Sequence, residues 1–161
     1  MNVSAFTLEY PAISKRLETD VVVQYGSSEV SAKALWDTGA TSTCISKDIV
    51  DSLNLIALGR QNILTPSGLS IANTYMVDIV LPNHVTVTGV KVCDSEIGSQ
   101  GLGVLIGMDI INLGDFAVSN YNDRTTFSFR IPSQIKTDYV VKAKFQDALG
   151  APHGKGKRKR K

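Results

Sequence analysis

Asp37 is the side chain best placed to do chemistry, because it follows an apolar run and precedes several small residues. Residues 34–42 read Ala-Leu-Trp-Asp-Thr-Gly-Ala-Thr-Ser. Gly39 permits a tight loop at little steric cost, so that backbone N–H groups of this loop can hold the Asp37 carboxylate. The segment therefore predicts a loop that presents one carboxylate to a cleft at the end of a strand.

One carboxylate is half of what acid–base hydrolysis of a peptide bond requires. Two carboxyl groups side by side share a proton, because like-charge repulsion raises the pKa of one of them and the resulting values belong to the pair. The ionised member activates a water molecule, and the protonated member supplies a proton to the leaving nitrogen. The chemistry that Asp37 suggests is therefore peptide hydrolysis by a carboxylate pair.

A second segment, Leu105-Ile106-Gly107-Met108-Asp109, places two apolar residues and a glycine before a short helical stretch. Together with Trp36-Asp37-Thr38-Gly39-Ala40-Thr41, about 70 residues earlier, it resembles the two signatures of the retropepsin family, the retroviral-type aspartic proteases and their cellular and bacterial relatives. The resemblance covers roughly residues 18–132. It implies a mostly β, closed barrel-like fold with one or two short helices, in which Ile106 and Gly107 support the catalytic loop.

The same resemblance implies an aspartic endopeptidase that works as a homodimer on a peptide or protein substrate. Asp-Thr-Gly occurs once in the chain, so a two-fold axis between the Asp37 loops of two copies would complete the carboxylate pair. Thr38 is expected to hydrogen-bond across the dimer beneath the carboxylates. Gly39 and Ala40 are expected to border the substrate channel, and Thr41 continues this active-site loop.

A turn at Thr65-Pro66-Ser67-Gly68, with arms reaching from about residue 62 to residue 75, looks like the flap that closes over a bound peptide in this family. Pro and Gly stand where a reversing chain favours them, and closure would exclude water from the scissile bond. The chain departs from retroviral members in two places. Gly68 is the only glycine of this flap, and Trp36 replaces the aliphatic residue before the catalytic Asp.

Short strands separated by turns must position these residues. Residues 19–25 and 29–36 predict a hairpin, and residues 46–53 a short helix with Ser46 as its N-cap. Further elements are expected as follows: strands at 75–81, 84–92 and 103–107, a helix at 108–113, and a hairpin formed by 115–119 and 125–131. Residues 139–146 are expected to form either a strand or a helix, since strand alternation and helical spacing both fit them poorly.

Composition is that of a soluble globular protein, with 43% hydrophobic and 20% charged residues. No apolar run approaches the roughly 20 residues of a membrane span, and the N-terminus has no signal-peptide pattern. We therefore expect a cytoplasmic protein with no membrane partner. The expected organisation is an N-terminal segment (1–17), a protease domain (18–132), a C-terminal extension (133–154) and a basic disordered tail (155–161).

No metal or cofactor is expected. Cys44 and Cys93 lack the spacing of a metal or redox motif and are expected to be reduced and partly buried. His84 and His153 are too far apart in sequence to suggest a metal site, and no phosphate-binding glycine motif occurs.

The basic tail and the single acidic motif leave a second function open. Six of the 17 Lys and Arg residues lie in Lys155–Lys161, which leaves 11 basic against 15 acidic residues elsewhere. Such a run can bind nucleic acid through phosphate contacts, or it is simply solvated. The alternative to a protease is therefore a catalytically inactive peptide-binding or regulatory protein of the same fold, with nucleic acid as a partner of the tail.

Overall fold

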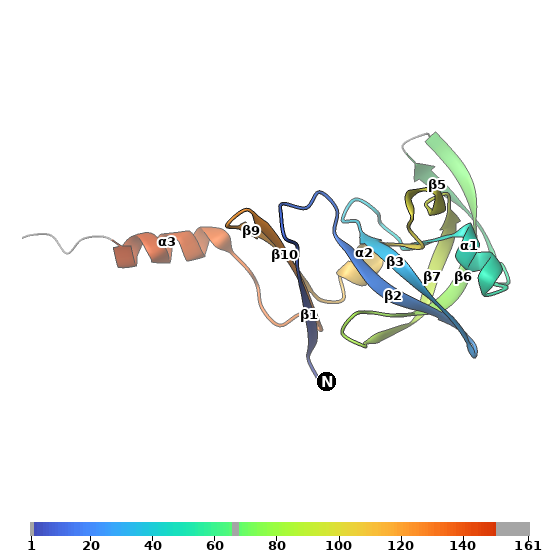
Figure 1. Cartoon of the computed structure of the whole chain (residues 1–161), viewed down its shortest axis with the longest axis horizontal. Coiled ribbons are helices and arrows are strands. Elements are labelled where there is room, and N and C mark those ends of the chain that lie inside the picture. The colour runs from blue at the N-terminus through green and yellow to red at the C-terminus, as the bar shows by residue number, and fades with distance from the viewer. Residues whose placement is uncertain (1, 66–67, 151–161) are drawn as a thin grey trace, which may run out of the picture.

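The computed structural model of the chain describes residues 2–65 and 68–150, and most of these residues form two β-sheets (Figure 1). The strands of the larger sheet pair in the order β2 (Glu18–Tyr25), β3 (Ser28–Trp36), β8 (Val104–Ile106), β4 (Cys44–Ser46), β7 (Thr86–Ser95), β6 (Gly68–Val80) and β5 (Gly59–Thr65). An additional β2–β6 pairing closes the first six of these strands into a barrel. The mostly β, closed fold that the sequence predicts is therefore confirmed.

Alternating side chains of the barrel strands fill its interior. The predicted hairpin of β2 and β3 turns at Gly26, whose φ of 60° suits glycine, and pairs Tyr25 with Ser28. Because successive strand side chains point to opposite faces, every second residue of β2 reaches the core. The fully enclosed apolar side chains, each 0% exposed, include Val23, Ala34, Ile45, Ile79, Val104 and Ile106.

A smaller sheet is formed by segments from both ends of the described chain, in the order β1 (Ser4–Glu9), β10 (Arg124–Ile131), β9 (Asp115–Tyr121). The β9–β10 hairpin was expected, although its turn is shorter than predicted. Asn122 and Asp123 alone make the reversal, with φ values of 52° and 59°, as in a two-residue turn of type I′. Strand β1 was not expected, since no strand was predicted in residues 1–17.

Trp36 joins the two sheets. Its ring lies 4.9 Å from Phe129, 5.2 Å from Phe127 and 5.8 Å from Phe6, measured between ring centroids. Its indole N–H donates a 2.9 Å hydrogen bond to the Thr19 hydroxyl. Aromatic pairs at these separations attract beyond the area they bury. The smaller sheet is therefore packed directly against the last residue of β3, which Asp37 follows.

Helices are short, except in the C-terminal extension. Helix α1 (Lys47–Ser52) has the predicted N-cap, since Ser46 accepts a hydrogen bond from the Ile49 N–H. Helix α2 (Met108–Ile111) follows β8, and a 3-10 turn, η1, covers Gly98–Gln100. Residues 139–146, for which a strand or a helix was expected, are helical and belong to α3 (Tyr139–Gly150). This helix projects away from the sheets (Figure 1).

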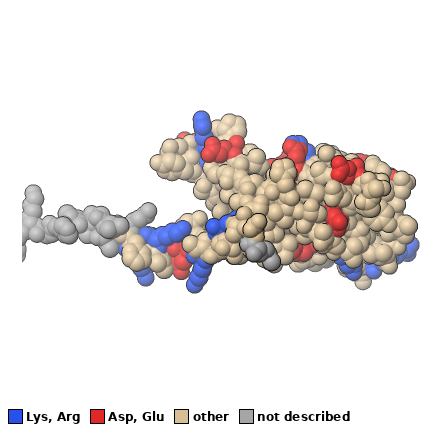
Figure 2. All heavy atoms as spheres, turned by 90° about the horizontal axis from the view of Figure 1, so that it is seen from below, with Lys and Arg blue, Asp and Glu red and all other residues tan. Residues whose placement is uncertain are grey.

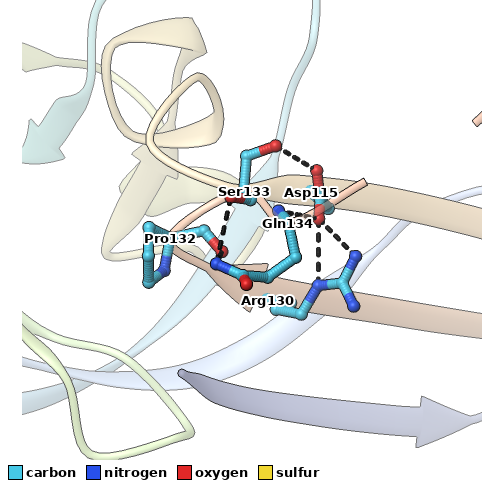
Figure 3. Close-up of polar contacts among 5 residues, drawn as sticks. All are labelled: Asp115, Arg130, Pro132, Ser133 and Gln134. Atoms are coloured by element: carbon cyan, nitrogen blue, oxygen red, sulfur yellow. Dashed lines mark hydrogen bonds and ion pairs between the residues drawn. The ribbon is translucent and has the colours of Figure 1, made fainter. Parts of the chain in front are cut away.

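The C-terminal extension leaves the smaller sheet at a network around Asp115 (Figure 3). The Asp115 carboxylate accepts hydrogen bonds from the Ser133 hydroxyl, the Gln134 N–H and the Arg130 guanidinium. These donors, with Ser133 first, hold the pKa of the Asp115 carboxyl well below its usual range. The network fixes where residues 133–134 lie relative to β9.

The charged surface differs between the two parts of the molecule. Figure 2 shows Lys and Arg side chains along the projecting C-terminal segment and at the far end of the β-sheet body, and acidic side chains scattered over that body. Among the residues that the structure describes, no helix is long and apolar enough to cross a membrane.

Candidate active site

Asp37 directly follows β3, on a loop that folds back on itself. The Asp37 N–H donates to the Ile106 carbonyl at 2.9 Å, and the Ala40 N–H donates to the Asp37 carbonyl at 3.2 Å. One oxygen of the Asp37 carboxylate accepts a 2.8 Å hydrogen bond from the Gly39 N–H. The carboxylate is half-buried, whereas Thr38 and Gly39 are exposed. The loop (residues 37–43, hereafter the active-site loop) thus holds its acid at the molecular surface.

Ile106 and Gly107 lie against the active-site loop. Strand β8 runs parallel to β3 and pairs Ile106 with Trp36. A Cβ atom on Gly107 would lie 2.6 Å from the carbonyl carbon of Ser42 and 2.7 Å from its oxygen, closer than any real contact. Only glycine therefore allows the backbones of the two signature segments to approach this closely.

A hydrogen-bonded clasp between Thr43 and Asp109, which no sequence pattern predicted, also holds the loop. Asp109 accepts from the Thr43 N–H at 2.9 Å and from the Thr43 hydroxyl at 2.7 Å. The same hydroxyl accepts from the Gly107 N–H at 3.1 Å. Thr43 is fully buried, so the Asp109 carboxylate ties the start of α2 to the end of the active-site loop.

The predicted flap is the end of the β5–β6 hairpin. Thr65 pairs with Gly68 at its tip, and Pro66 and Ser67 lie outside the described residues. Three apolar side chains near this tip are exposed to solvent: Leu64 at 86%, Leu69 at 73% and Ile71 at 68%. An apolar patch of this kind, raised on a hairpin, is a surface suited to contact with another chain.

What this arrangement can do chemically is limited by the single carboxylate. The Thr38 hydroxyl forms no hydrogen bond to any other residue that the structure describes. Within residues 2–65 and 68–150, no three His, Cys, Asp or Glu side chains are grouped as a metal site requires. One chain presents an ordered carboxylate and an exposed loop face, and no second carboxyl group in residues 2–65 and 68–150 hydrogen-bonds to Asp37.

The chain is similar to known aspartic proteases in sequence and in fold. Residues 24–112 match the family described as "gag-polyprotein putative aspartyl protease". Among solved structures, a retropepsin-like aspartic protease from Rickettsia conorii superposes with a TM-score of 0.54 and 15% identity, over 81% of this chain and 97% of that chain. At this identity the likeness shows the fold.

A retroviral structure is also similar. The EIAV protease in complex with the inhibitor HBY-793 gives a TM-score of 0.49 and 19% identity, over 63% of this chain and 89% of that chain. No curated protein matches the sequence.

Proposed function

This chain belongs to the gag-polyprotein aspartyl protease family, whose fold is retropepsin-like, and we propose that it is an aspartic endopeptidase that acts as a homodimer. Asp37 of each copy supplies one carboxyl group. A water molecule held between the two groups attacks the peptide carbonyl, and the proton shared by the pair moves to the leaving nitrogen.

The observation that carries this proposal is the construction of the active-site loop. Asp37 is held by the backbone N–H of Gly39, and the loop is held from below by Gly107 and by the Thr43–Asp109 clasp. Preorganised groups of this kind are what acid–base catalysis requires, since small misplacements of a reacting group slow the chemical step. A loop with only a packing role would need no such support for its carboxylate.

Two features support the role of a second copy. Thr38 is exposed beside the carboxylate with an unused hydroxyl among the described residues, where a facing loop would offer it a partner. Strand β9 pairs only with β10 within the described part of the chain, and an open strand edge is able to accept a strand from another chain. The flap residues Thr65 and Gly68 would then close over the substrate from the other side.

The experiment that tests this function is cleavage of a diverse peptide library by wild type and Asp37→Asn, at high protein concentration and between about pH 4 and 7. We expect cleavage by wild type alone, since the amide cannot activate water. Sizing of both proteins at the assay concentration is the control. If wild type is dimeric at the assay concentration and cleaves no peptide, the result would support a catalytically inactive peptide-binding protein instead.

A further inference from the structure

The two cysteines of the chain face each other across neighbouring strands. Cys44 of β4 is the register partner of Cys93 of β7, and their sulfur atoms lie 3.0 Å apart as free thiols. Neighbouring strands are about 4.8 Å apart, within the Cα separation of about 4.4–6.8 Å that disulfides span. A covalent bond therefore needs the sulfurs to approach by only about 1 Å, to the usual length of about 2.05 Å.

The two thiols differ in exposure and in proton affinity. Cys93 is 1% exposed, whereas Cys44 is half-buried. A hydrogen bond to Cys93 and burial raise the pKa of the Cys44 thiol, and the same hydrogen bond lowers the pKa of Cys93. The pair thus combines an accessible sulfur with a buried partner that more readily carries negative charge, as a resolving thiol must.

The position of the pair connects it to the active-site loop. Cys44 directly follows Thr43, the buried residue of the clasp. The Cys93 N–H donates to the Thr43 carbonyl across a long 3.4 Å contact. On the other side, hydrogen bonding by the Gln61 side chain also lowers the pKa of Cys93, and Gln61 belongs to flap strand β5. The sulfurs therefore lie where the active-site loop and the flap hairpin meet.

We propose that Cys44 and Cys93 are a reversible dithiol–disulfide pair that joins β4 to β7 and controls the active-site loop. The oxidant is a low-molecular-weight disulfide, of which oxidised glutathione is the probe. The accessible Cys44 sulfur attacks one sulfur of that disulfide as its proton passes to the Cys93 thiolate 3.0 Å away, and one glutathione thiolate is released. Cys93 then attacks the sulfur of Cys44 in the mixed disulfide and releases the second, and the two protons of the protein thiols end on the two glutathiones.

Oxidation slows peptide cleavage, a consequence that rests on the proposed function. Drawing Cys44 toward Cys93 pulls on Thr43, whose hydroxyl and N–H hold the loop through Asp109. A displacement of about 1 Å in a positioning group can cost up to about 100-fold in rate. We expect oxidised protein to cleave at least about threefold more slowly than reduced protein.

The chemical test uses the full chain, which has only these two cysteines. After incubation with oxidised glutathione, wild type should lose about 2 Da, resist thiol alkylation, migrate as a single chain on a non-reducing gel and return to the dithiol with dithiothreitol. Cys44→Ser should gain no intramolecular bond. A persistent glutathione adduct, a disulfide between two chains or an unreactive folded protein would each overturn the proposal.

The functional test compares each protein with its own reduced form. Cleavage by wild type should fall on oxidation and recover with dithiothreitol, while Cys44→Ser should show no change. Asp37→Asn serves as a second control, because it should form the same disulfide without cleaving peptide. If wild type forms the disulfide but cleaves no peptide in either its oxidised or its reduced form, the result would count against the proposed function and not against the disulfide. A disulfide that leaves cleavage by wild type unchanged would refute control of the loop.

Discussion

The active-site loop and the flap hairpin (β5 and β6) lie on the same barrel but are built in opposite ways. The loop is fixed by backbone contact at Gly107 and by the hydrogen bonds of buried Thr43. The flap ends in exposed apolar side chains, with Leu69 among them. The difference is consistent with the function proposed above, in which a preorganised loop would carry the chemistry and an open hairpin would adapt to the substrate.

The largest expected effect comes from filling the space between the two signature segments. Gly107→Ala places a Cβ atom against the Ser42 backbone, which cannot move aside as a flexible side chain would. We expect a loss of about 3 kcal/mol in the free energy of unfolding and loss of peptide cleavage. Thermal denaturation and the library assay measure both.

Gly59→Ala in the flap is the matched control. A Cβ atom there meets only the Thr74 hydroxyl at 3.8 Å, an ordinary contact. It should change stability by less than about 0.5 kcal/mol. Equal effects of the two substitutions would contradict the view that the loop is the more tightly packed region.

Removing the clasp should weaken the loop next. Asp109→Ala leaves the buried Thr43 N–H and hydroxyl without their acceptor, at a cost of about 2 kcal/mol. Asp109→Asn should cost less, because its amide oxygen can still accept from one of the two donors. We expect kcat to fall about tenfold for the Ala variant, with KM little changed.

Asp51→Ala tests whether that result is specific to the clasp. Asp51 is an exposed residue of α1, so the Asp51→Ala substitution should leave kcat unchanged. A larger change in KM than in kcat for Asp109→Ala would place the clasp in substrate binding rather than in positioning of Asp37.

The flap should show the reverse pattern. Leu69→Ser removes an exposed apolar side chain, so stability should change by less than about 0.5 kcal/mol. We expect KM to rise several-fold while kcat stays within about twofold, since the flap contributes binding rather than chemistry. Met76→Ser, farther along β6 and 42% exposed, is the control, and steady-state kinetics separates the two constants.

The smallest effect concerns pH and the network that anchors the C-terminal extension. The pKa of Asp115 is lowered in the folded chain, chiefly by the hydrogen bond from Ser133. A depressed carboxyl pKa adds stability that is present above about pH 4, the usual unfolded value, and is lost as the pH falls through the folded value.

Asp115→Asn should therefore lower the melting temperature by a few degrees at most at pH 7, and equally at pH 5. The difference from wild type should shrink near pH 2. A difference that instead disappears between pH 7 and 5 would show that another group, not Asp115, is responsible. Melting curves at the three pH values measure this.

The sequence predicted features that depend on neighbouring residues better than features that depend on pairing between distant strands. Local patterns predicted the β2–β3 hairpin and the Ser46 cap, because each depends on residues that are adjacent in the sequence. The approach of Ile106 and Gly107 to Asp37 was expected only from the family resemblance. Strand β1 was missed because its partner, β10, lies more than a hundred residues away, and pairing at that distance leaves no local signal.

Two features near the active-site loop could not be predicted from the sequence, for a related reason. Thr43 is an ordinary residue in the sequence, and only the fold reveals that its buried hydroxyl joins Gly107 to Asp109. Cys44 and Cys93 are 49 residues apart and meet through strand register rather than through a motif. The contacts of Thr43 and of the two cysteines therefore depend on long-range strand register, which residue spacing in the sequence does not reveal.

The most direct test of the central claim is a mixing experiment with wild type and Asp37→Asn, at constant total protein and under conditions where both are dimeric. If each copy supplies half of the carboxylate pair, mixed dimers are inactive and cleavage falls as the square of the wild-type fraction. At equal mixing, activity would then be about one quarter of that of wild type alone. Activity that falls in direct proportion to the wild-type fraction would show that one chain suffices, and would contradict the account.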